Sequence, residues 1–287
     1  MMKTTKTPET ITLEKTFPGN IPPAVAPPDA PQSGFAEKIA IVTGGGRGIG
    51  FAVARQLIAH GAEMVALFDL KQEALEKAVT SLDKTHCYPV AVDVTDEEQV
   101  KNAVTQIASR YGRIDLLANM AGIPGPSARV ENYSFSAFKN VYAVNVFGTF
   151  LMMKYCLPYM QKNRYGTIVN TCSCSGMRGY ALEIGYGSSK SAVLGMTMNA
   201  ANENGGNGVR VNCVSPGWVN TGMLDDILSQ YADTKDGGYT KETLRNGTMN
   251  RPSTPDEVAN VVRFLLSDDA RYVNGANFVC DGGKTLG

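Results

Sequence analysis

Short apolar runs alternate with amphipathic segments along the chain from residue 37 onward. Each apolar run has the length of a buried strand, and between the runs apolar residues recur at helical spacing, as Ile49, Val53 and Leu57 do. Such alternation predicts parallel strands joined by crossover helices on both faces of one sheet. We therefore predict an α/β fold, a single doubly wound Rossmann sheet of seven strands at 39–43, 64–69, 88–92, 114–119, 167–173, 209–214 and 276–281. Helices are expected after 48, at 71–82, 96–111 and 136–163, from about 185, and from Pro255, where TPDEV forms a capping box.

The first 36 residues have a different composition. They contain seven of the fourteen prolines, and proline removes backbone donors and favours extended conformations. We predict a flexible N-terminal arm, with packing on a neighbouring subunit as the alternative. The segment has no hydrophobic signal core and no arginine, which argues against a secretion or transit signal. The remaining residues, 37–287, fit one domain.

Composition and charge narrow the classes of function. The chain has 27 basic and 27 acidic residues and no long basic run, which argues against nucleic acid or an anionic membrane as a partner. No apolar run approaches the ~18 residues of a membrane span. The six cysteines include no CxxC pair and do not resemble a secreted disulfide framework, so a cytoplasmic location is expected. With two histidines and no ligand spacing, no metal site is expected.

A glycine-rich stretch, TGGGRGIG at 43–50, lies at the first strand-to-helix junction. Gly44 permits a tight turn, Gly48 lets the backbone approach a pyrophosphate, and Gly50 permits close packing of the helix whose N–H groups face phosphate. Glycine also serves ordinary turns, so the position after the first strand carries the argument. The remaining predicted contacts of this loop are Gly46, Arg47 and Ile49.

Asp69 ends the second predicted strand, where an acid accepts hydrogen bonds from a ribose 2′-OH and repels a 2′-phosphate. Its alternative role is the N-cap of the following helix. Arg47 and Lys71 are cations that favour a 2′-phosphate instead. Because Asp69 has the more direct geometry, we predict NAD as the cofactor, with NADP as the alternative.

Tyr186 and Lys190, in YGSSK, are four residues apart and share one face of a predicted helix. The adjacent ammonium, with a positive nicotinamide ring, is expected to lower the phenol pKa from ~10, so that the tyrosine transfers protons near neutral pH. The alternative is a surface Tyr–Lys pair. Ser173 ends a predicted strand thirteen residues earlier, and its hydroxyl can donate a hydrogen bond to a substrate carbonyl. It has no GxSxG context and no histidine placed for a triad, so we do not expect a hydrolase nucleophile.

An ordered set of motifs runs through residues 37–287. Its members are TGGGRGIG at 43–50, Asp93-Val94, NMAG at 119–122, Asn145 in VNVFG, Ser173, YGSSK at 186–190, PGWVNT at 216–221 and DGG at 281–283. Each motif alone is common, but the ordered set is specific, and it resembles the short-chain dehydrogenase/reductase superfamily in its single-domain form. Met120 and Cys172 depart from the family pattern without removing a catalytic atom.

The resemblance implies a role for each matching residue. Tyr186 would transfer the proton and Ser173 would position the substrate oxygen. Lys190 would hold the nicotinamide ribose and lower the tyrosine pKa, and Asn145 would hold a water in a relay to Lys190. Cofactor contacts would also come from Asp93 and Val94 on the adenine side, from Asn119, Ala121 and Gly122 in the cleft, and from Pro216, Gly217, Val219 and Thr221 at the carboxamide. Hydride would pass directly between nicotinamide and substrate carbon. The family also implies a homo-oligomer, a tetramer or a dimer.

The substrate side is less determined. The resemblance implies a substrate lid at 222–250 and a pocket edged by Ser173, Cys174, Ser175, Met177, Tyr180, Glu183 and Trp218. The aromatic and thioether side chains favour an apolar or cyclic alcohol, whereas Glu183 favours the hydroxyls of a sugar or polyol. The alternative for Glu183 is a solvated loop acid.

These observations predict an NAD-dependent oxidoreductase that interconverts a secondary alcohol and a ketone, with a small molecule as its partner. One enzymatic alternative is an NADP-dependent 3-oxoacyl or polyketide-type ketoreductase, against which Asp69 argues. Another is a metal-dependent alcohol dehydrogenase. A non-catalytic dinucleotide sensor or scaffold is the alternative of another class, against which the complete set of Asn145, Ser173, Tyr186 and Lys190 argues.

Overall fold

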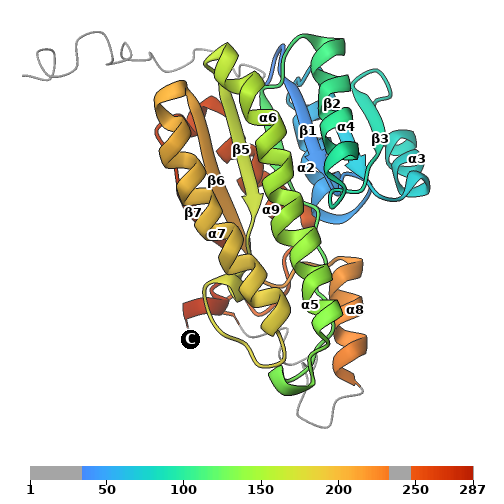
Figure 1. Ribbon diagram of the computed structural model, residues 1–287, viewed down its shortest axis with the longest axis vertical. Helices are drawn as coiled ribbons and strands as arrows, with labels where there is room; N and C mark the ends of the chain where they lie inside the picture. Colours follow the sequence, from blue (N-terminus) through green and yellow to red (C-terminus); the bar gives the residue numbers. More distant parts are fainter. Residues whose placement is uncertain (1–33, 233–246, 287) are drawn as a thin grey trace, which may run out of the picture. The chain divides into compact units, whose positions relative to one another are not determined.

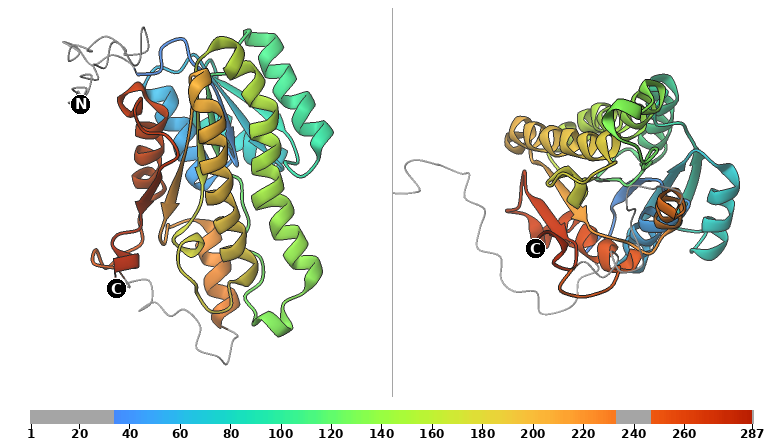
Figure 2. Two further views of the ribbon diagram at one scale, coloured as in Figure 1. Left: turned by 60° about the vertical axis from the view of Figure 1, so that its left-hand side comes forward. Right: turned by 90° about the horizontal axis from the view of Figure 1, so that it is seen from below.

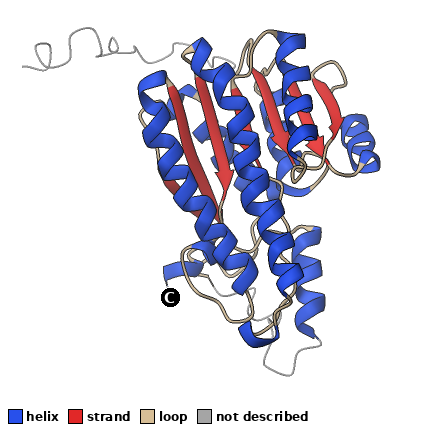
Figure 3. Ribbon diagram, viewed as in Figure 1, coloured by secondary structure: helices blue, strands red, loops and turns tan. Residues whose placement is uncertain are grey.

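Seven parallel strands form one sheet in the computed structural model, which describes residues 34–232 and 247–286 (Figure 1; Figure 3). Their order is β3-β2-β1-β4-β5-β6-β7, so the chain runs outward from β1 to one edge and then crosses to the other side. The order reverses between β1 and β4, and ligands of such sheets bind beside the carboxyl ends of the strands at this point. The predicted doubly wound sheet is confirmed. The strands are β1 Ile39–Thr43, β2 Met64–Asp69, β3 Cys87–Ala91, β4 Leu116–Asn119, β5 Gly166–Thr171, β6 Val209–Pro216 and β7 Asn277–Cys280.

Helices cover both faces of the sheet (Figure 2). Successive side chains of a strand point to opposite faces, and β1 shows this directly. Ala40 and Val42 pack in a core cluster with α2, α3 and α9, whereas Ile39 and Ile41 pack in a second cluster with α4, α6 and α7. The helices are α2 Gly48–Ala59, α3 Gln72–Ser81, α4 Glu97–Tyr111, α5 Phe135–Tyr142, α6 Thr149–Asn163, α7 Ile184–Asn204, α8 Gly222–Ala232 and α9 Pro255–Leu266.

The long helix expected at 136–163 is interrupted. A π-helical turn, Ala143–Gly148, separates α5 from α6. Thr149 supports this turn by donating its hydroxyl to the carbonyl oxygen of Asn145 at 2.8 Å. Gly148 is the last residue of the turn, and a Cβ atom on it would lie 2.8 Å from a methyl carbon of Val94, so a larger residue would clash there. The extra residue of the turn leaves Asn145 fully buried, and π turns are common at functional sites.

The start of α9 confirms the predicted capping box. The Thr254 hydroxyl accepts the backbone N–H of Glu257 at 3.3 Å, and the Glu257 carboxylate accepts the backbone N–H of Thr254 at 2.8 Å. Arg251 also binds that carboxylate, with contacts of 2.6 and 2.8 Å. The cap satisfies N–H groups that the first turn leaves without a helical partner.

Residues Ser33–Gly287 form one compact unit, distinct from Met1–Gln32. Phe35, near the end of the predicted arm, is 1% exposed and packs in the core cluster around α2. The rest of the predicted arm, and residues 233–246 of the predicted lid, lie outside the described residues. Among the helices that are described, none has the length and apolar character needed to cross a bilayer.

Candidate active site

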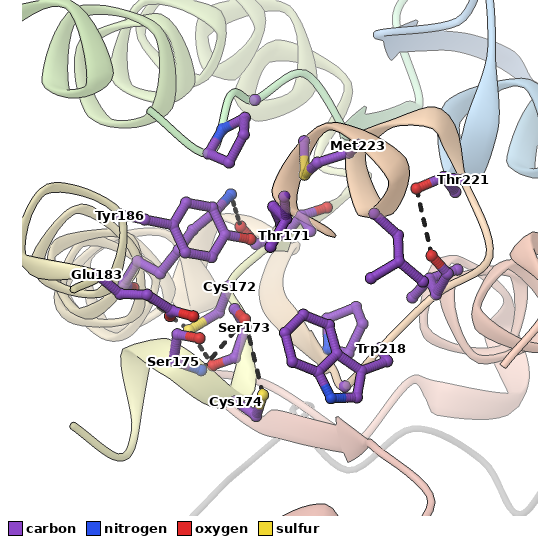
Figure 4. Close-up of a pocket in the computed structure, with 18 of the residues that line it drawn as sticks. Thr171, Cys172, Ser173, Cys174, Ser175, Glu183, Tyr186, Trp218, Thr221 and Met223 are labelled. Carbon is purple, nitrogen blue, oxygen red and sulfur yellow. Dashed lines mark hydrogen bonds between the residues drawn. The ribbon is translucent and has the colours of Figure 1, made fainter. Parts of the chain in front are cut away.

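A cavity of about 900 Å³, including its open mouth, lies at the carboxyl ends of β4, β5 and β6. Ser173 and Tyr186 face it from one side, and Trp218 and Thr221 from the other (Figure 4). Ile49 reaches it from the first turn of α2, so the glycine-rich turn stands at its rim. The structure therefore brings the two predicted motifs together, at the place that the strand order indicates.

The glycine-rich turn has the shape of a phosphate cradle. Gly44 and Gly48 have φ of 63° and 57°, in the left-handed region that favours glycine. A Cβ atom on Gly50 would lie 2.2 Å from the carbonyl oxygen of Gly44, so only glycine lets α2 approach the turn this closely. Arg47 precedes α2 without a side-chain cap, which leaves the first N–H groups of the helix facing outward. These features fit a dinucleotide pyrophosphate.

Asp69 is held at the end of β2 by the glycine turn. Its carboxylate accepts the backbone N–H of Gly46 at 3.1 Å and that of Lys71 at 3.2 Å. The alternative of a helix N-cap is wrong, because Lys71 occupies the N-cap position of α3. Arg47, next to Gly46, and Lys71, two residues after Asp69, are both exposed.

Of the predicted cofactor contacts after β3 and β4, one lines the cavity and the others do not. Asn119 is buried and donates to Asn170 at 2.8 Å, which supports its predicted structural part, whereas Gly122 lines the cavity. Asp93 accepts from Thr95 at 2.8 Å within its own turn. Val94, Ala121, Asp93 and Asn119 lie outside the lining of the cavity.

Thr43, the first residue of the motif TGGGRGIG, has a role that was not predicted from the sequence. Its hydroxyl accepts the backbone N–H groups of Met120 and Ala121 at 3.0 and 3.1 Å. These bonds hold the segment after β4 against the end of β1. Its signals in the sequence were a polar residue at the end of an apolar strand and its place at the start of the glycine-rich motif.

Tyr186, Ser173 and Lys190 converge at the end of β5. Ser173 leaves the strand after Thr171, and its hydroxyl accepts the N–H of Ser175 at 3.2 Å. Lys190 is 4% exposed and donates to the carbonyl oxygen of Thr171 at 2.8 Å. The alternative of a surface Tyr–Lys pair is thereby wrong.

Burial controls the acidity of both groups. It raises the pKa of the Tyr186 phenol above its usual range, while a hydrogen bond with Ser173 acts in the opposite direction. In the chain by itself this pKa is raised, and the expected lowering, which includes a positive nicotinamide ring, stays a prediction. Burial also lowers the pKa of Lys190 to about 8, because a charged ammonium is poorly solvated there.

Asn145 joins the π turn to the same cluster. Its side chain donates to Ser189 at 2.9 Å and exchanges two bonds with the backbone of Ile123, at 2.9 and 3.0 Å. An ideal Cβ on Gly122 would lie 3.2 Å from the Asn145 amide oxygen and 3.4 Å from Lys190 Nζ. Asn145 and Lys190 thus approach Gly122 together, and a water between them stays a prediction.

Comparison with known proteins agrees with this geometry. A family model described as enoyl-(acyl carrier protein) reductase matches residues 44–285. Levodione reductase of Leifsonia aquatica is 35% identical over 260 residues, covering 89% of this chain and 97% of its own. The chain belongs to the short-chain dehydrogenase/reductase superfamily.

Other members of the superfamily are similar over the same range. Meso-2,3-butanediol dehydrogenase of Serratia marcescens is 37% identical over 88% of this chain and 96% of its own. The crystal structure of NAD⁺-bound xylitol dehydrogenase superposes with a TM-score of 0.82 at 34% identity, covering 87% of this chain and 99% of that one.

The substrate side of this short-chain dehydrogenase/reductase differs in part from the prediction. Met177 does not line the cavity, because its sulfur faces Asn277 at 2.8 Å, beside β7. Tyr180 is also absent from the lining, and its ring lies under the ammonium of Lys284. The predicted substrate-pocket residues that line the cavity are Ser173, Cys174, Ser175, Glu183 and Trp218. The predicted cofactor contacts that line it are Ile49, Gly122, Tyr186, Lys190, Pro216, Gly217, Val219 and Thr221.

Several lining residues were missed. Met223, Leu224 and Ile227 of α8 give the cavity an apolar wall, and their helical spacing was a signal within the predicted lid. Lys284 enters from the segment after β7. A single lysine three residues before the last residue of the sequence carries no pattern of its own.

Proposed function

We propose that this chain is an NAD-dependent oxidoreductase that interconverts a secondary alcohol and a ketone. The observation that carries the proposal is the convergence of Ser173, Tyr186 and Lys190 in one cavity, with the glycine turn at its rim. The relatives named above are a reductase and two dehydrogenases of hydroxyl compounds, which supports the same chemistry.

The side chains would divide the reaction between them. When bound, a nicotinamide dinucleotide supplies or accepts hydride at the substrate carbon. Ser173 donates a hydrogen bond to the substrate oxygen, and Tyr186 transfers the proton to or from that oxygen. Because burial raises its pKa, Tyr186 holds its proton at neutral pH and is ready to protonate a ketone oxygen. Lys190, fixed by the Thr171 carbonyl, stabilises the phenolate that remains.

The proposed cofactor is NAD rather than NADP. Asp69 lies at the end of β2 with its carboxylate beside the glycine turn, where it would repel a 2′-phosphate. The exposed Arg47 and Lys71 support the NADP alternative. The description of the matching family model names an acyl carrier protein, whose cargo is a thioester. This supports the 3-oxoacyl ketoreductase as the alternative function.

We also propose a cytoplasmic homo-oligomer, a tetramer or a dimer. Six free thiols support a reducing compartment. Phe147 of the π turn, Phe150 of α6 and Met198 of α7 are exposed apolar side chains, which supports burial against another subunit.

A substrate screen tests the proposal. Purified chain is incubated with NAD or NADP and a panel of cyclic secondary alcohols, polyols, hydroxysteroids and hydroxy acids, and nicotinamide reduction is followed by absorbance. We expect turnover with NAD that survives a metal chelator. Turnover on no alcohol, or turnover abolished by the chelator, contradicts the proposal. A higher rate with NADP and 3-oxoacyl thioesters identifies the ketoreductase instead.

A further inference from the structure

Lys284 brings a cation into the substrate side of the cavity. Its Nζ lies 3.7 Å from the centroid of the Trp218 ring and 4.5 Å from that of the Tyr180 ring. It lines the same cavity as Ser173 and Tyr186. Ammonium groups at such distances are attracted to aromatic faces, so the two rings hold the charge near this position.

Lys284 lies in a turn that side-chain hydrogen bonds stabilise. The Asp281 carboxylate accepts the N–H groups of Gly283 and Thr285 at 2.9 and 2.8 Å, and the Thr285 hydroxyl at 2.7 Å. Gly282 and Gly283 have φ of 62° and 80°, which other residues rarely adopt. The turn therefore fixes the direction in which Lys284 leaves the backbone.

The same turn is attached to the segment that follows the undescribed residues 233–246. The carbonyl oxygen of Gly282 accepts the backbone N–H of Met249 at 3.1 Å and the Thr248 hydroxyl at 3.2 Å. A Cβ atom on Gly283 would lie 2.3 Å from the Thr248 hydroxyl oxygen. Two parts of the chain thus hold Lys284 at the cavity wall.

Neighbouring groups of the wall act on the charge of Lys284. Burial lowers the pKa of Lys284, while hydrogen bonding by Cys174 and the carboxylates of Glu183 and Asp281 act against the lowering. Glu183 lines the cavity as well. Lys284 thus offers a donor and Glu183 an acceptor on the wall of one cavity, which suits neutral oxygen-bearing substrates.

Lys284, Cys174 and Ser173 line the same cavity. The Cys174 sulfur lies 4.0 Å from the Ser173 hydroxyl oxygen, and Cys174 counters part of the effect of burial on the Lys284 pKa. A donor at Lys284 and one at Ser173 therefore face the same substrate space. The apolar wall of Met223 and Leu224 leaves room for a carbon skeleton opposite them.

We propose that Lys284 is a specificity-determining residue that donates a hydrogen bond to a second substrate oxygen, on the carbon next to the reacting one. The preferred substrates are then neutral vicinal diols and the corresponding hydroxyketones and diketones. This inference rests on the proposed function. In diol oxidation the reacting C–H hydrogen would leave as hydride to the nicotinamide and the hydroxyl proton would pass to Tyr186 in its phenolate form, stabilised by Lys190 and by a positive nicotinamide ring. A hydroxyketone forms. Lys284 keeps its proton throughout.

The test compares cyclohexanol with 1,2-cyclohexanediol, both with NAD, in wild type, Lys284→Met and Lys284→Arg. Wild type should prefer the diol, and Lys284→Met should lose about tenfold or more in kcat/KM for the diol, the size of a hydrogen bond to a charged group. Its kcat/KM for cyclohexanol should change less than threefold, and Lys284→Arg should restore part of the diol preference. Lys162→Met, an exposed lysine near the end of α6, is the matched control and should change neither value.

A second readout does not depend on turnover. Trp218 is the one tryptophan in the sequence, and Lys284 lies over its ring, so its fluorescence reports ligand at this wall. The diol should change Trp218 fluorescence in wild type at lower concentration than in Lys284→Met. Equal losses for both alcohols, or none, overturn the role of Lys284 while leaving the proposed function intact. If wild type oxidises neither alcohol and shows no cofactor-dependent turnover in the wider screen, the proposed function fails first.

Discussion

The ammonium nitrogen of Lys190 lies 5.7 Å from the centre of the Tyr186 ring and is bonded to the Thr171 carbonyl oxygen at 2.8 Å. This arrangement holds a cation beside the Tyr186 phenol. Burial nevertheless raises the phenol pKa above its usual value. The chain by itself thus favours a protonated tyrosine. Lowering of that pKa has to come from further positive charge in the cavity.

Replacing Tyr186 with Phe removes the proposed proton donor and leaves the ring that packs in the cavity. We expect kcat to fall by about a thousandfold or more, since positioned acid–base groups contribute on this scale. Dinucleotide affinity should change little, because the glycine turn and Asp69 are untouched. Steady-state assays and cofactor titration measure the two effects.

Tyr155→Phe is the matched control, because it removes only a hydrogen bond between α6 and Glu97 at 2.7 Å. A sensor or scaffold would keep its function in Tyr186→Phe. Retention of more than a tenth of wild-type turnover by Tyr186→Phe would rule out the assigned role.

The pKa of Lys190 sets an expected pH dependence. With its pKa lowered to about 8, Lys190 is charged below that pH and neutral above it. Ketone reduction also needs protonated Tyr186, whose raised pKa keeps its proton through this range. We therefore expect kcat/KM for reduction to be level below pH 8 and to fall above it. A profile that is flat to pH 9.5 would contradict the account.

Lys190→Met should make the fold more stable while it lowers turnover. The folded pKa is below the ordinary lysine value of 10.5, so the folded state binds fewer protons than the unfolded state between about 8 and 10.5. The free energy of unfolding of the wild type therefore rises with pH through this window. At pH 7 the full cost of burying the charged Lys190 is present. Its size is on the order of 3 kcal/mol, offset in the variant by about 1–2 kcal/mol for the Thr171 carbonyl left without its partner.

Urea unfolding at pH 7 and pH 10 measures this effect. The advantage of Lys190→Met should be about 1–2 kcal/mol at pH 7 and should shrink or reverse at pH 10. Lys162→Met, exposed at the surface, should show no such pH dependence. Destabilisation of Lys190→Met at pH 7 would mean that burial of the charge costs little.

The sheet could be predicted because short apolar runs, each of the length of a buried strand, alternate with amphipathic helical segments. The site could be predicted where spacing carries chemistry, as with Tyr186 and Lys190 on one helix face. Met177 was misassigned because its sequence position does not show that its sulfur faces Asn277. The place of Lys284 depends on a turn built by Asp281 and on contacts with Thr248, which link segments distant in sequence.

Asp69→Asn tests the choice of cofactor while keeping the turn intact. The amide oxygen still accepts the Gly46 N–H that the carboxylate accepts at 3.1 Å, so the loop should keep its shape. Removing the charge ends the repulsion of a 2′-phosphate and weakens the hydrogen bond to a ribose hydroxyl. With Arg47 and Lys71 exposed nearby, the NAD-to-NADP ratio of kcat/KM should fall by about tenfold to a hundredfold, or roughly 1.4–2.8 kcal/mol. Asp83→Asn, an exposed acid beyond α3, should leave the ratio unchanged. An unchanged ratio in Asp69→Asn would show that Asp69 serves only the local backbone, through its hydrogen bonds with the N–H groups of Gly46 and Lys71.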